Sequence, residues 1–594
     1  MNNEAKMTFG QQYAKTLNES KDPYQVGHSV RPVDTLKDII EGGAKLYGDR
    51  PAFWQKFDGK TYTPKSYNEA LADVNALGTA LLSLGLKGKH IGIIGENSYW
   101  WAVAYFAAPS GVGVSVPLDK ELAAEDLRAL VREADVKCVI LSPRFEKVFA
   151  PMLTEDDAPI LITTGDKPSD PAILTFADML EKGRKLMKEG DRSFLDAEID
   201  TECMSVLLYT SGTTGLSKGV MLSHRNLCAD AMICQSIFRC GPDDVFFSVL
   251  PVHHTYECTG GMLYPLMVGA SIGYCQGLRY MQQNLKELRP TFFLGVPLIF
   301  EKFYANIWKT IRKGGKEKAV KTLLGVQRTL HKVGVNKQLK PLKAITDVFG
   351  GRLENIVSSG AAIDPAILDF FNDAGVFAAQ GYGLTECAPL VSVNPNKREM
   401  LRNASVGHAP ITIDVRIDDP DEDGNGEICV RGANIMLGYY KMPEQTAEVL
   451  KDGWFHTGDL GHLDKDNYIY ITGRKKNVII TANGKNVFPE ELEYHLQKSN
   501  YVEEAFVWAD ETERGDDKSI IATIRPNDDY FEEVLGHKPN EDEHQEILQK
   551  VVDEYNKDQP IYKRIGRLVV RTEDFEKTSA SKIKRFAAEN KRLD

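Results

Sequence analysis

The segment from Tyr209 to Gly219 holds the residue types that bind phosphate. It reads YTSGTTGLSKG, with three glycines, six hydroxyl side chains and one lysine, and it follows the apolar run Val206 to Leu208. Glycines let a backbone turn tightly and approach a ligand, while hydroxyls, freed amides and a positive charge attract phosphate oxygens. The segment therefore predicts a phosphate-binding loop.

This loop does not fit the Walker A pattern of P-loop NTPases, which is G-x-x-x-x-G-K-[ST]. Counted from Gly212, Ser217 stands where the second glycine belongs, and Gly219 stands where a serine or threonine belongs. The segment is therefore not a Walker A loop, and it must be a phosphate-binding loop of a different kind.

The string resembles the nucleotide-binding loop of the adenylate-forming superfamily, which contains acyl-CoA synthetases, luciferases and the adenylation domains of peptide synthetases. The resemblance implies that the loop binds ATP and that one of its hydroxyls helps to bind Mg²⁺. Thr210 and Thr213 are the alternatives for that hydroxyl, and we assign it to Thr213. The implied ATP-binding residues of the loop are Thr210, Ser211, Gly212, Thr213, Thr214, Gly215 and Lys218.

Two later segments resemble the family's adenine-binding motifs: GYGLTEC at 381–387 and SSGAAI at 358–363. In the family the first segment stacks its aromatic ring on adenine and holds magnesium through its glutamate, roles that fall on Tyr382 and Glu386. A hard cation with oxygen ligands suits the charge of a triphosphate. The implied nucleotide contacts are Gly360, Ala361, Tyr382 and Thr385.

DGWFHTGDLG, at 452–461, matches a third family motif, in which Asp459 corresponds to the aspartate that accepts hydrogen bonds from both ribose hydroxyls. In the following GRKK, Arg474 matches an arginine that reaches the nucleotide, and Lys476 falls at the family's hinge position. Long-chain acyl types and luciferases often carry lysine there, whereas acetyl types commonly carry aspartate. The hinge and the similarity along Leu36 to Phe106 place the chain closest to long-chain fatty-acid CoA ligases.

Near the C-terminus, KTSASKIKR at 577–585 resembles the family's P-K-T-x-x-G-K-I-x-R. Lys582 aligns with the catalytic lysine that bridges the substrate carboxylate and the α-phosphate. Glu576 replaces the usual proline and Ser581 the usual glycine, so the geometry of this loop departs from the family pattern while the lysine stays in register.

The acyl-binding residues are predicted from LPVHHTYE at 250–257, which resembles a string of long-chain acyl-CoA synthetases that lines the acyl site. His254 occupies its histidine, although such a histidine is also common as a satisfied core residue. Gly260 and Gly261 follow, and they either leave room for an acyl tunnel or serve as ordinary packing glycines.

The resemblance implies a reaction in two halves. A medium- or long-chain fatty acid attacks ATP·Mg²⁺ to give an acyl adenylate and pyrophosphate, and the thiol of coenzyme A then displaces AMP. TANGKNVFPEELE at 481–493 resembles the loop that enters the site for the thiol step, so Gly484 is expected near the pantetheine path. An acyl-acyl carrier protein ligase or an acyl-AMP ligase, which would use another acceptor, remains the alternative.

The elements that must position these residues follow an α/β pattern. Ile91 to Ile94, Val112 to Val116 and Val139 to Leu141 are strand-like, with helical spacing between them, which predicts a parallel sheet covered by helices. The family resemblance adds a β-barrel-like subdomain and a small mobile α+β domain. We expect an N-terminal adenylation domain at 1–472, a hinge at 473–477, where GRKKNVI reads as a linker, and a C-terminal domain at 478–594.

Composition describes an ordinary soluble protein of 594 residues, with a net charge of −12 that argues against binding of nucleic acid by the whole surface. Nine scattered cysteines without a C-x-x-C pair suggest free thiols in a reducing compartment and give no support for zinc. The N-terminus lacks a secretory signal pattern. A cytoplasmic protein is expected, and the sequence does not predict its oligomeric state.

One segment departs from the acidic average. Residues 302–343 contain twelve lysines or arginines against a single glutamate, Glu317, with apolar residues interleaved at helical spacing. A solvated helical face is the favoured interpretation, and peripheral attachment to the inner face of a membrane is the alternative hypothesis.

Overall fold

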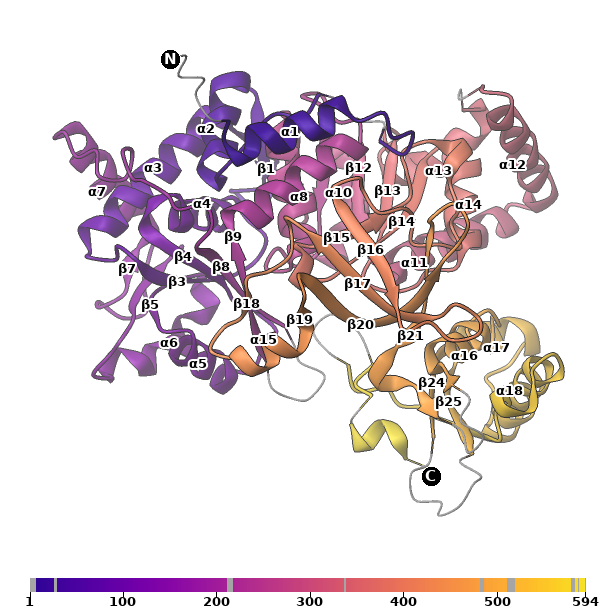
Figure 1. Ribbon diagram of the computed structural model, residues 1–594. Coiled ribbons are helices and arrows are strands. Elements are labelled where there is room, and N and C mark those ends of the chain that lie inside the picture. The colour runs from indigo at the N-terminus through magenta and orange to yellow at the C-terminus, as the bar shows by residue number, and fades with distance from the viewer. Residues whose placement is uncertain are drawn as a thin grey trace. The chain divides into compact units, whose positions relative to one another are not determined.

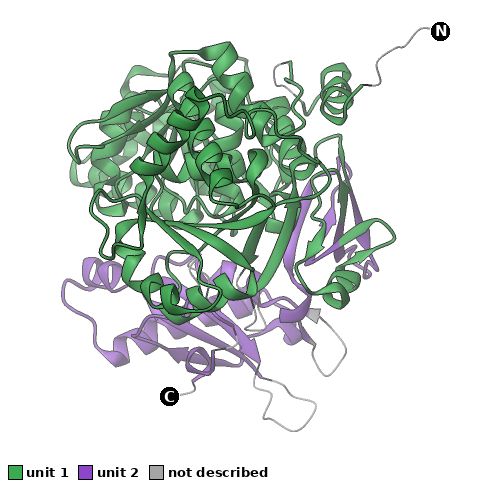
Figure 2. Ribbon diagram, turned by 90° about the vertical axis from the view of Figure 1, so that its left-hand side faces the viewer, with its two compact units in different colours: residues 1–210, 217–414, 430–455 green, residues 211–216, 415–429, 456–594 purple. Residues whose placement is uncertain are grey.

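The computed structural model describes residues 7–25, 29–210, 217–335, 338–480, 486–509, 519–577, 583–585 and 587–592. The chain divides into two units (Figure 2). The first comprises residues 1–210, 217–414 and 430–455, and the second comprises residues 211–216, 415–429 and 456–594.

The first unit contains an eight-stranded sheet with the order β7-β6-β5-β3-β4-β8-β9-β18 (Figure 1). Its strands from β7 to β8 run parallel, and β9 and β18 are antiparallel to their neighbours. The strands are β3 (Lys89–Ile94), β4 (Gly113–Pro117), β5 (Val136–Leu141), β6 (Ile160–Thr163), β7 (Leu174–Thr175), β8 (Met204–Thr210), β9 (Lys218–Ser223) and β18 (Gly438–Tyr439).

The alternation predicted from the sequence is confirmed in this sheet. β3, α4 (Tyr99–Ala107), β4, α5 (Ala124–Glu133) and β5 follow one another along the chain. Helix α4 is almost wholly buried, which accounts for its uninterrupted apolar sequence. In α5 the buried side chains are Leu127, Leu130 and Val131, a spacing that places them on one face.

A second eight-stranded sheet has the order β15-β14-β13-β12-β10-β11-β1-β2. Its inner strands are parallel, while β15 and β2 pair antiparallel at the two edges. The strands are β1 (Pro51–Gln55), β2 (Thr63–Ser66), β10 (Val245–Ser248), β11 (Ser271–Tyr274), β12 (Phe292–Gly295), β13 (Asn355–Ser358), β14 (Phe377–Gly383) and β15 (Leu390–Val393).

Several helices of the first unit begin with capping boxes, in which a hydroxyl side chain and the side chain three residues later satisfy the free backbone amides. The boxes pair Thr35 with Asp38 at α2 (Leu36–Tyr47), Ser66 with Glu69 at α3 (Tyr67–Ser83), and Ser223 with Asn226 at α8 (His224–Ile237). The basic segment forms α11 (Pro297–Lys313) and α12 (Glu317–Lys332).

The second unit contains most of a five-stranded half-barrel sheet, which is made of β16 (Ile413–Asp418), β17 (Gly426–Gly432), β19 (Leu450–Lys451), β20 (Trp454–Leu463) and β21 (Ile469–Arg474). It also contains the sheet β24 (Val502–Ala509), β25 (Ile520–Pro526) and β26 (Arg567–Val570) with helices α16 (Pro489–Leu496), α17 (Asp528–Leu535) and α18 (Glu541–Lys557). The predicted α/β class, with a β-barrel-like part and an α+β part, is confirmed.

Within the described residues, no helix combines the length and the apolar character needed to cross a bilayer. All nine cysteines are described and none forms a disulfide, as their scattered spacing predicts.

Candidate active site

The phosphate-binding loop predicted from the sequence joins two antiparallel strands. β8 ends at Thr210 and β9 begins at Lys218, and these two residues are directly paired. The Thr210 hydroxyl donates to the Lys218 carbonyl across the pair at 3.4 Å. The loop therefore leads into a strand and not into a helix as a P-loop does, so the predicted phosphate binding would depend on amides, hydroxyls and the lysine without the help of a helix dipole. Ser211, Gly212, Thr213, Thr214 and Gly215 lie outside the described residues.

Glu386 is positioned by a short helical turn, Thr385–Cys387, that follows β14. Its Oε1 accepts a hydrogen bond from the Tyr439 hydroxyl at 2.9 Å. Tyr439 lies on β18, which pairs with β9, the strand that leaves the phosphate loop. The Lys218 Nζ lies 4.6 Å from the centre of the Tyr439 ring. Tyr439 thus links the predicted magnesium carboxylate to the loop lysine.

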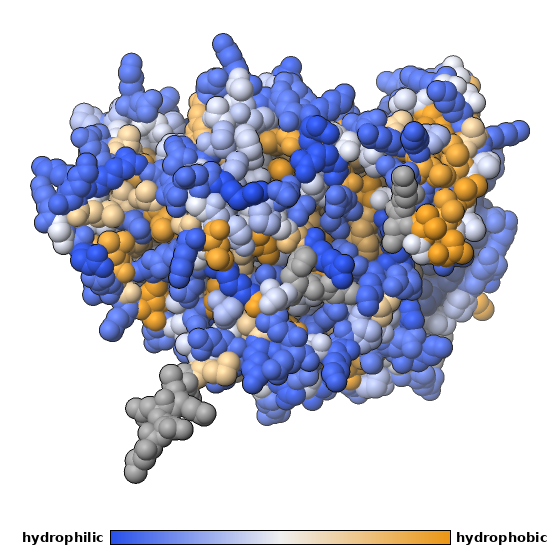
Figure 3. Space-filling view, turned by 90° about the horizontal axis from the view of Figure 1, so that it is seen from above, coloured by the Kyte–Doolittle hydropathy of each residue, from blue (hydrophilic) through white to orange (hydrophobic). Residues whose placement is uncertain are grey.

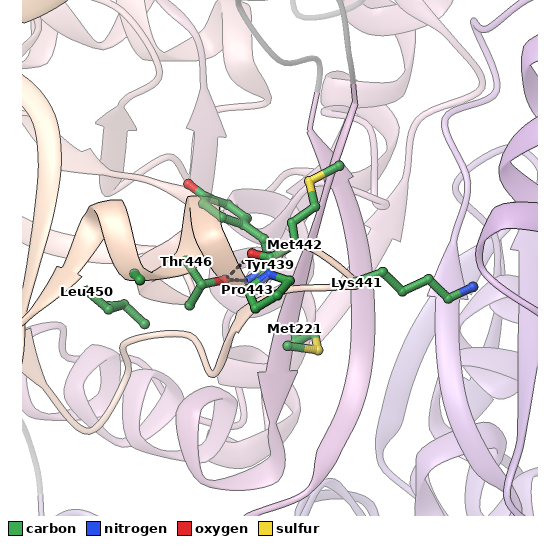
Figure 4. A pocket seen from close by; sticks show the side chains of 8 residues that line it. Met221, Tyr439, Lys441, Met442, Pro443, Thr446 and Leu450 are labelled. Carbon is green, nitrogen blue, oxygen red and sulfur yellow. Dashed lines mark hydrogen bonds between the residues drawn. The ribbon is translucent and has the colours of Figure 1, made fainter.

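Sequence reasoning did not select Tyr439. The residue is 53 positions from Glu386, and the two are brought together by the pairing of β18 with β9 and by a hydrogen bond of 2.8 Å from the Met436 amide to the Glu386 carbonyl. A pocket of about 420 Å³ lies beside it, lined by Met221, Tyr439, Lys441, Met442, Pro443, Thr446, Ala447 and Leu450 (Figure 4). The Thr446 hydroxyl accepts from the Tyr439 amide at 2.9 Å. Lys441 extends away from the pocket and pairs with Asp135 at 2.7 Å.

The residues predicted around adenine follow neighbouring parallel strands. β13 ends at Ser358 and β14 continues to Gly383, with Ser358 paired to Gln380. Ligands in open α/β sheets bind beyond the carboxyl ends of parallel strands. Gly360 lies there with φ of 88°, a conformation that favours glycine, Ala361 is exposed, and Tyr382 is buried.

The segment predicted to bind the acyl chain follows β10 and enters a π-helical stretch, Tyr256–Leu263. The ring of His254 lies 4.2 Å from that of the buried His253. A Cβ at Gly261 would lie 3.0 Å from Cδ of Glu257, and one at Gly260 would lie 3.2 Å from Leu294. These contacts favour packing roles for both glycines.

Glu257 in the same segment is completely buried, and neither carboxyl oxygen makes a hydrogen bond of ordinary geometry. Burial raises the pKa of this carboxyl to about 8, and the nearby Ser248 hydroxyl opposes the rise. Burial therefore favours the neutral form of the Glu257 carboxyl. It is the last residue of the acyl string at 250–257, but the resemblance gave it no role.

In the second unit, Asp459 on β20 and Arg474 on β21 are directly paired. Arg474 Nε contacts Asp459 Oδ1 at 2.9 Å, and Asp459 is buried. The structure thus joins the two residues predicted to reach the ribose and the nucleotide. Lys476 lies in the helical turn Lys475–Asn477 that follows β21. Gly484 and Lys582 lie outside the described residues.

Comparison with known proteins identifies the family to which this chain belongs. A family model described as AMP-binding enzyme matches residues 40–440, and a model described as AMP-binding enzyme C-terminal domain matches residues 476–592. The chain belongs to the AMP-binding enzymes. These are the adenylate-forming proteins that the sequence motifs resemble, and the recognition made from those motifs is confirmed.

The curated relatives of this AMP-binding enzyme include Long chain acyl-CoA synthetase 1 of Arabidopsis thaliana, 28% identical over 577 residues that cover 88% of this chain and 83% of the relative. Fatty acyl-CoA synthetase B of Dictyostelium discoideum is 29% identical over 560 residues, covering 86% and 80%.

Among solved structures, the anthranilate CoA ligase AuaEII in complex with anthranoyl-AMP superposes with a TM-score of 0.74 at 19% identity, over 94% of this chain and 97% of that one. ATP-bound MatB from Rhodopseudomonas palustris gives a TM-score of 0.72 at 22% identity, over 93% and 98%. Both establish the fold of this AMP-binding enzyme.

Proposed function

We propose that this enzyme is a fatty-acid CoA ligase that activates a medium- or long-chain fatty acid with ATP and transfers it to coenzyme A. The observation that carries the proposal is the similarity to long-chain acyl-CoA synthetases over more than four fifths of both chains. The motifs from Tyr209 to Arg585 lie in the order that such an enzyme requires.

A fatty carboxylate cannot lose oxide, so its oxygen attacks the α-phosphorus of ATP and expels pyrophosphate. The acyl adenylate that results carries AMP as a leaving group, which the thiol of coenzyme A displaces at the carbonyl carbon. Catalysis of the first half consists chiefly of positioning and of neutralising phosphate charge. We assign that neutralisation to the loop after β8, to Lys218 and to Lys582.

The residues present fit a magnesium ion at Glu386. Its carboxylate is partly exposed, and the Tyr439 hydroxyl fixes one of its oxygens, so it offers an oriented hard oxygen ligand bonded to the same tyrosine that Lys218 contacts. We propose Glu386 and Thr213 as protein ligands. When bound, Mg²⁺ neutralises the charge of the triphosphate.

The nucleotide contacts are assigned on the same basis. Tyr382 stacks on adenine, with Gly360 and Ala361 at the end of the neighbouring strand. Asp459 accepts from the ribose hydroxyls, and its ion pair with Arg474 holds the carboxylate in place. Two second-unit assignments come from the resemblance alone: Lys476 as a hinge residue within 473–477 and Gly484 on the pantetheine path.

The acyl site is assigned to the segment after β10, with His254 as its histidine. Gly260 and Gly261 border it, although a Cβ at either position would lie within 3.2 Å of a neighbouring side chain. Chain-length preference is left to experiment.

Release of pyrophosphate from ATP, measured with saturated acids of increasing length, tests this function. We expect release to depend on acid and Mg²⁺, to be strongest with medium or long chains, and to yield acyl-CoA when coenzyme A is present. If the acyl group is transferred to holo-acyl carrier protein and not to coenzyme A, the carrier protein is the acceptor and the proposed acceptor is wrong. Absence of pyrophosphate release with every fatty acid would overturn the proposal.

We further propose that α12 and the residues after it contact anionic membrane surfaces. Val326, Val333 and Val335 are exposed, at 46%, 70% and 43%, among the lysines of the segment 302–343. Apolar side chains gather on the right of Figure 3, the side on which Figure 1 places α12. Exposed apolar residues ringed by lysines suit the interface of an anionic bilayer.

Sedimentation with vesicles of phosphatidylglycerol and phosphatidylcholine tests this contact. Charge reversal at the exposed Lys313, Lys316 and Lys318 should abolish binding. Lys321 is left in place because it pairs with Glu317 at 2.7 Å. Reversal of the exposed Lys60, Lys87 and Lys89 is the matched control and should leave binding intact. Undiminished binding of the first variant would contradict the proposal.

A further inference from the structure

Three strands of the half-barrel bring together side chains that ligate transition metals. Asp418 ends β16, Cys429 lies on β17, and His456 lies on β20. One ligand atom from each lies within 4.8 Å of the others. Among the residues that the structure describes, this is the only such group of three. None of the three is assigned to the binding of nucleotide, magnesium or acyl chain.

Two of the distances in this group are close to those across a tetrahedral ion. Cys429 Sγ lies 3.3 Å from His456 Nδ1, and His456 Nδ1 lies 3.2 Å from Glu427 Oε2. Zinc bonds of about 2.3 Å to sulfur and about 2.0 to 2.1 Å to nitrogen and oxygen, at the tetrahedral angle, place such atoms about 3.5 and about 3.3 Å apart. These two pairs would need to move by only a few tenths of an ångström, whereas the Asp418 carboxylate, which lies within 4.8 Å of the Cys429 and His456 ligand atoms, would close in further on binding.

The group is screened from solvent on one side and open on the other. Cys429 is completely buried, and the side chains of His456 and Glu427 are 13% and 11% exposed. The Asp418 side chain is 41% exposed and leaves access for an ion. Two cations already contact the carboxylates: Lys475 at Glu427 and Arg416 at Asp418, at 2.9 and 3.4 Å.

We propose that Asp418, Cys429 and His456 bind a zinc ion, and that Glu427, which contacts His456, turns from Lys475 toward the ion as the fourth ligand. A mixed set of thiolate, imidazole and carboxylate ligands suits zinc and does not suit Mg²⁺ or Ca²⁺, which prefer oxygen alone. On binding, the thiol proton passes to solvent, and the imidazole carries its own proton on Nε2.

The ligands come from three different strands, 27 residues separating Cys429 from His456. The site therefore has no local C-x-x-C or C-x-x-H pattern. The absence of such a pattern, which left zinc without support from the sequence, does not test a site whose ligands come from separate strands. The two residues after His456 are already bonded to β17, through the Thr457 hydroxyl to Ile428 and the Gly458 amide to Glu427. A zinc ion would add a third link between β17 and β20, at His456, three residues before Asp459.

Binding of Co²⁺ in place of zinc can be followed by absorption spectroscopy, which tests the site independently of enzyme activity. Full-length protein is treated with a chelator, dialysed and titrated with Co²⁺. We expect one equivalent to produce a thiolate-to-cobalt charge-transfer band in the near ultraviolet together with the visible bands of a four-coordinate ion, and we expect Zn²⁺ to bleach both. Absence of these bands at one equivalent would overturn the proposal.

Cys429→Ser should abolish the charge-transfer band, and His456→Gln should weaken Co²⁺ binding at least tenfold. Cys203→Ser is the matched control. Cys203 is exposed and contacts Asp200 at 3.0 Å, so this thiol and carboxylate could bind Co²⁺ non-specifically. Thermal unfolding of each metal-free variant verifies folding. If Cys429→Ser misfolds, Asp418→Asn replaces it, with loss of tight binding expected. A band that survives Cys429→Ser, Co²⁺ binding that stays as tight in Asp418→Asn as in the native protein, or a band that is lost with Cys203→Ser would refute the site.

Discussion

Replacing Glu257 by glutamine should make the enzyme more stable in alkaline solution. The native carboxyl is buried without a hydrogen bond of ordinary geometry, and its pKa is raised from 4.5 to about 8 by that burial. Between these two values the folded state keeps a proton that the unfolded state has lost, so folding stability falls as pH rises. Glutamine has a similar shape and cannot ionise, and the variant escapes this loss.

The size of the effect follows from the two pKa values. Linkage gives a destabilisation from Glu257, relative to acid conditions, of about 2 kcal/mol at about pH 6 and about 5 kcal/mol at about pH 8.5. The variant should therefore gain about 2 to 3 kcal/mol on the native protein between these conditions, an upper value because local water can enter on ionisation.

Urea unfolding of both proteins at the two pH values measures this gain from the transition midpoints. Glu121→Gln, at an exposed position, serves as the control and should show no comparable gain. If the difference between Glu257→Gln and the native protein is the same at both pH values, Glu257 is not held neutral and the description of the acyl segment is wrong.

Three further predictions concern the catalytic groups. Lys582→Ala should abolish pyrophosphate release yet leave thioester formation from synthetic acyl adenylate largely intact; equal loss of both halves would refute the separate role of this lysine. Tyr439→Phe removes a hydrogen bond to the Glu386 carboxylate, a bond worth about 1.5 to 3 kcal/mol, and should raise the Mg²⁺ concentration for half-maximal release about tenfold or more. An unchanged Mg²⁺ requirement would show that Tyr439 does not position the ligand. Asp459→Asn keeps the size of the side chain but weakens its contact with Arg474, and should raise KM for ATP far more than KM for the fatty acid, whereas a parallel rise would contradict a ribose contact.

Much of the fold could be predicted because its pattern is local. The strands and helices between Ile91 and Leu141 are short apolar runs separated by helical spacing, and a parallel sheet buries both. The pairing of Asp459 with Arg474 could be anticipated in part, since both fall in family motifs that surround the nucleotide. The resemblance could not show that the two residues face each other across β20 and β21.

Contacts between distant segments were beyond the reach of such patterns. Tyr439 meets Glu386 because a two-residue strand pairs with β9, and no periodicity marks so short a strand. Asp418, Cys429 and His456 converge through sheet pairing alone. Glu257 is buried because of the residues that pack around it in the fold. A glutamate is ordinarily expected to be exposed to solvent, so the sequence alone did not predict its burial.

The central claim is that the carboxylate of a fatty acid attacks the α-phosphorus of ATP. A fatty acid carrying heavy oxygen in its carboxylate tests this directly, with mass spectrometry of the products after one turnover in the presence of coenzyme A. We predict that one labelled oxygen appears in AMP and none in pyrophosphate, because the attacking oxygen stays on the α-phosphorus when the thiol displaces it. Label in orthophosphate, with ADP as the nucleotide product, would contradict an adenylate intermediate and the function proposed for this chain.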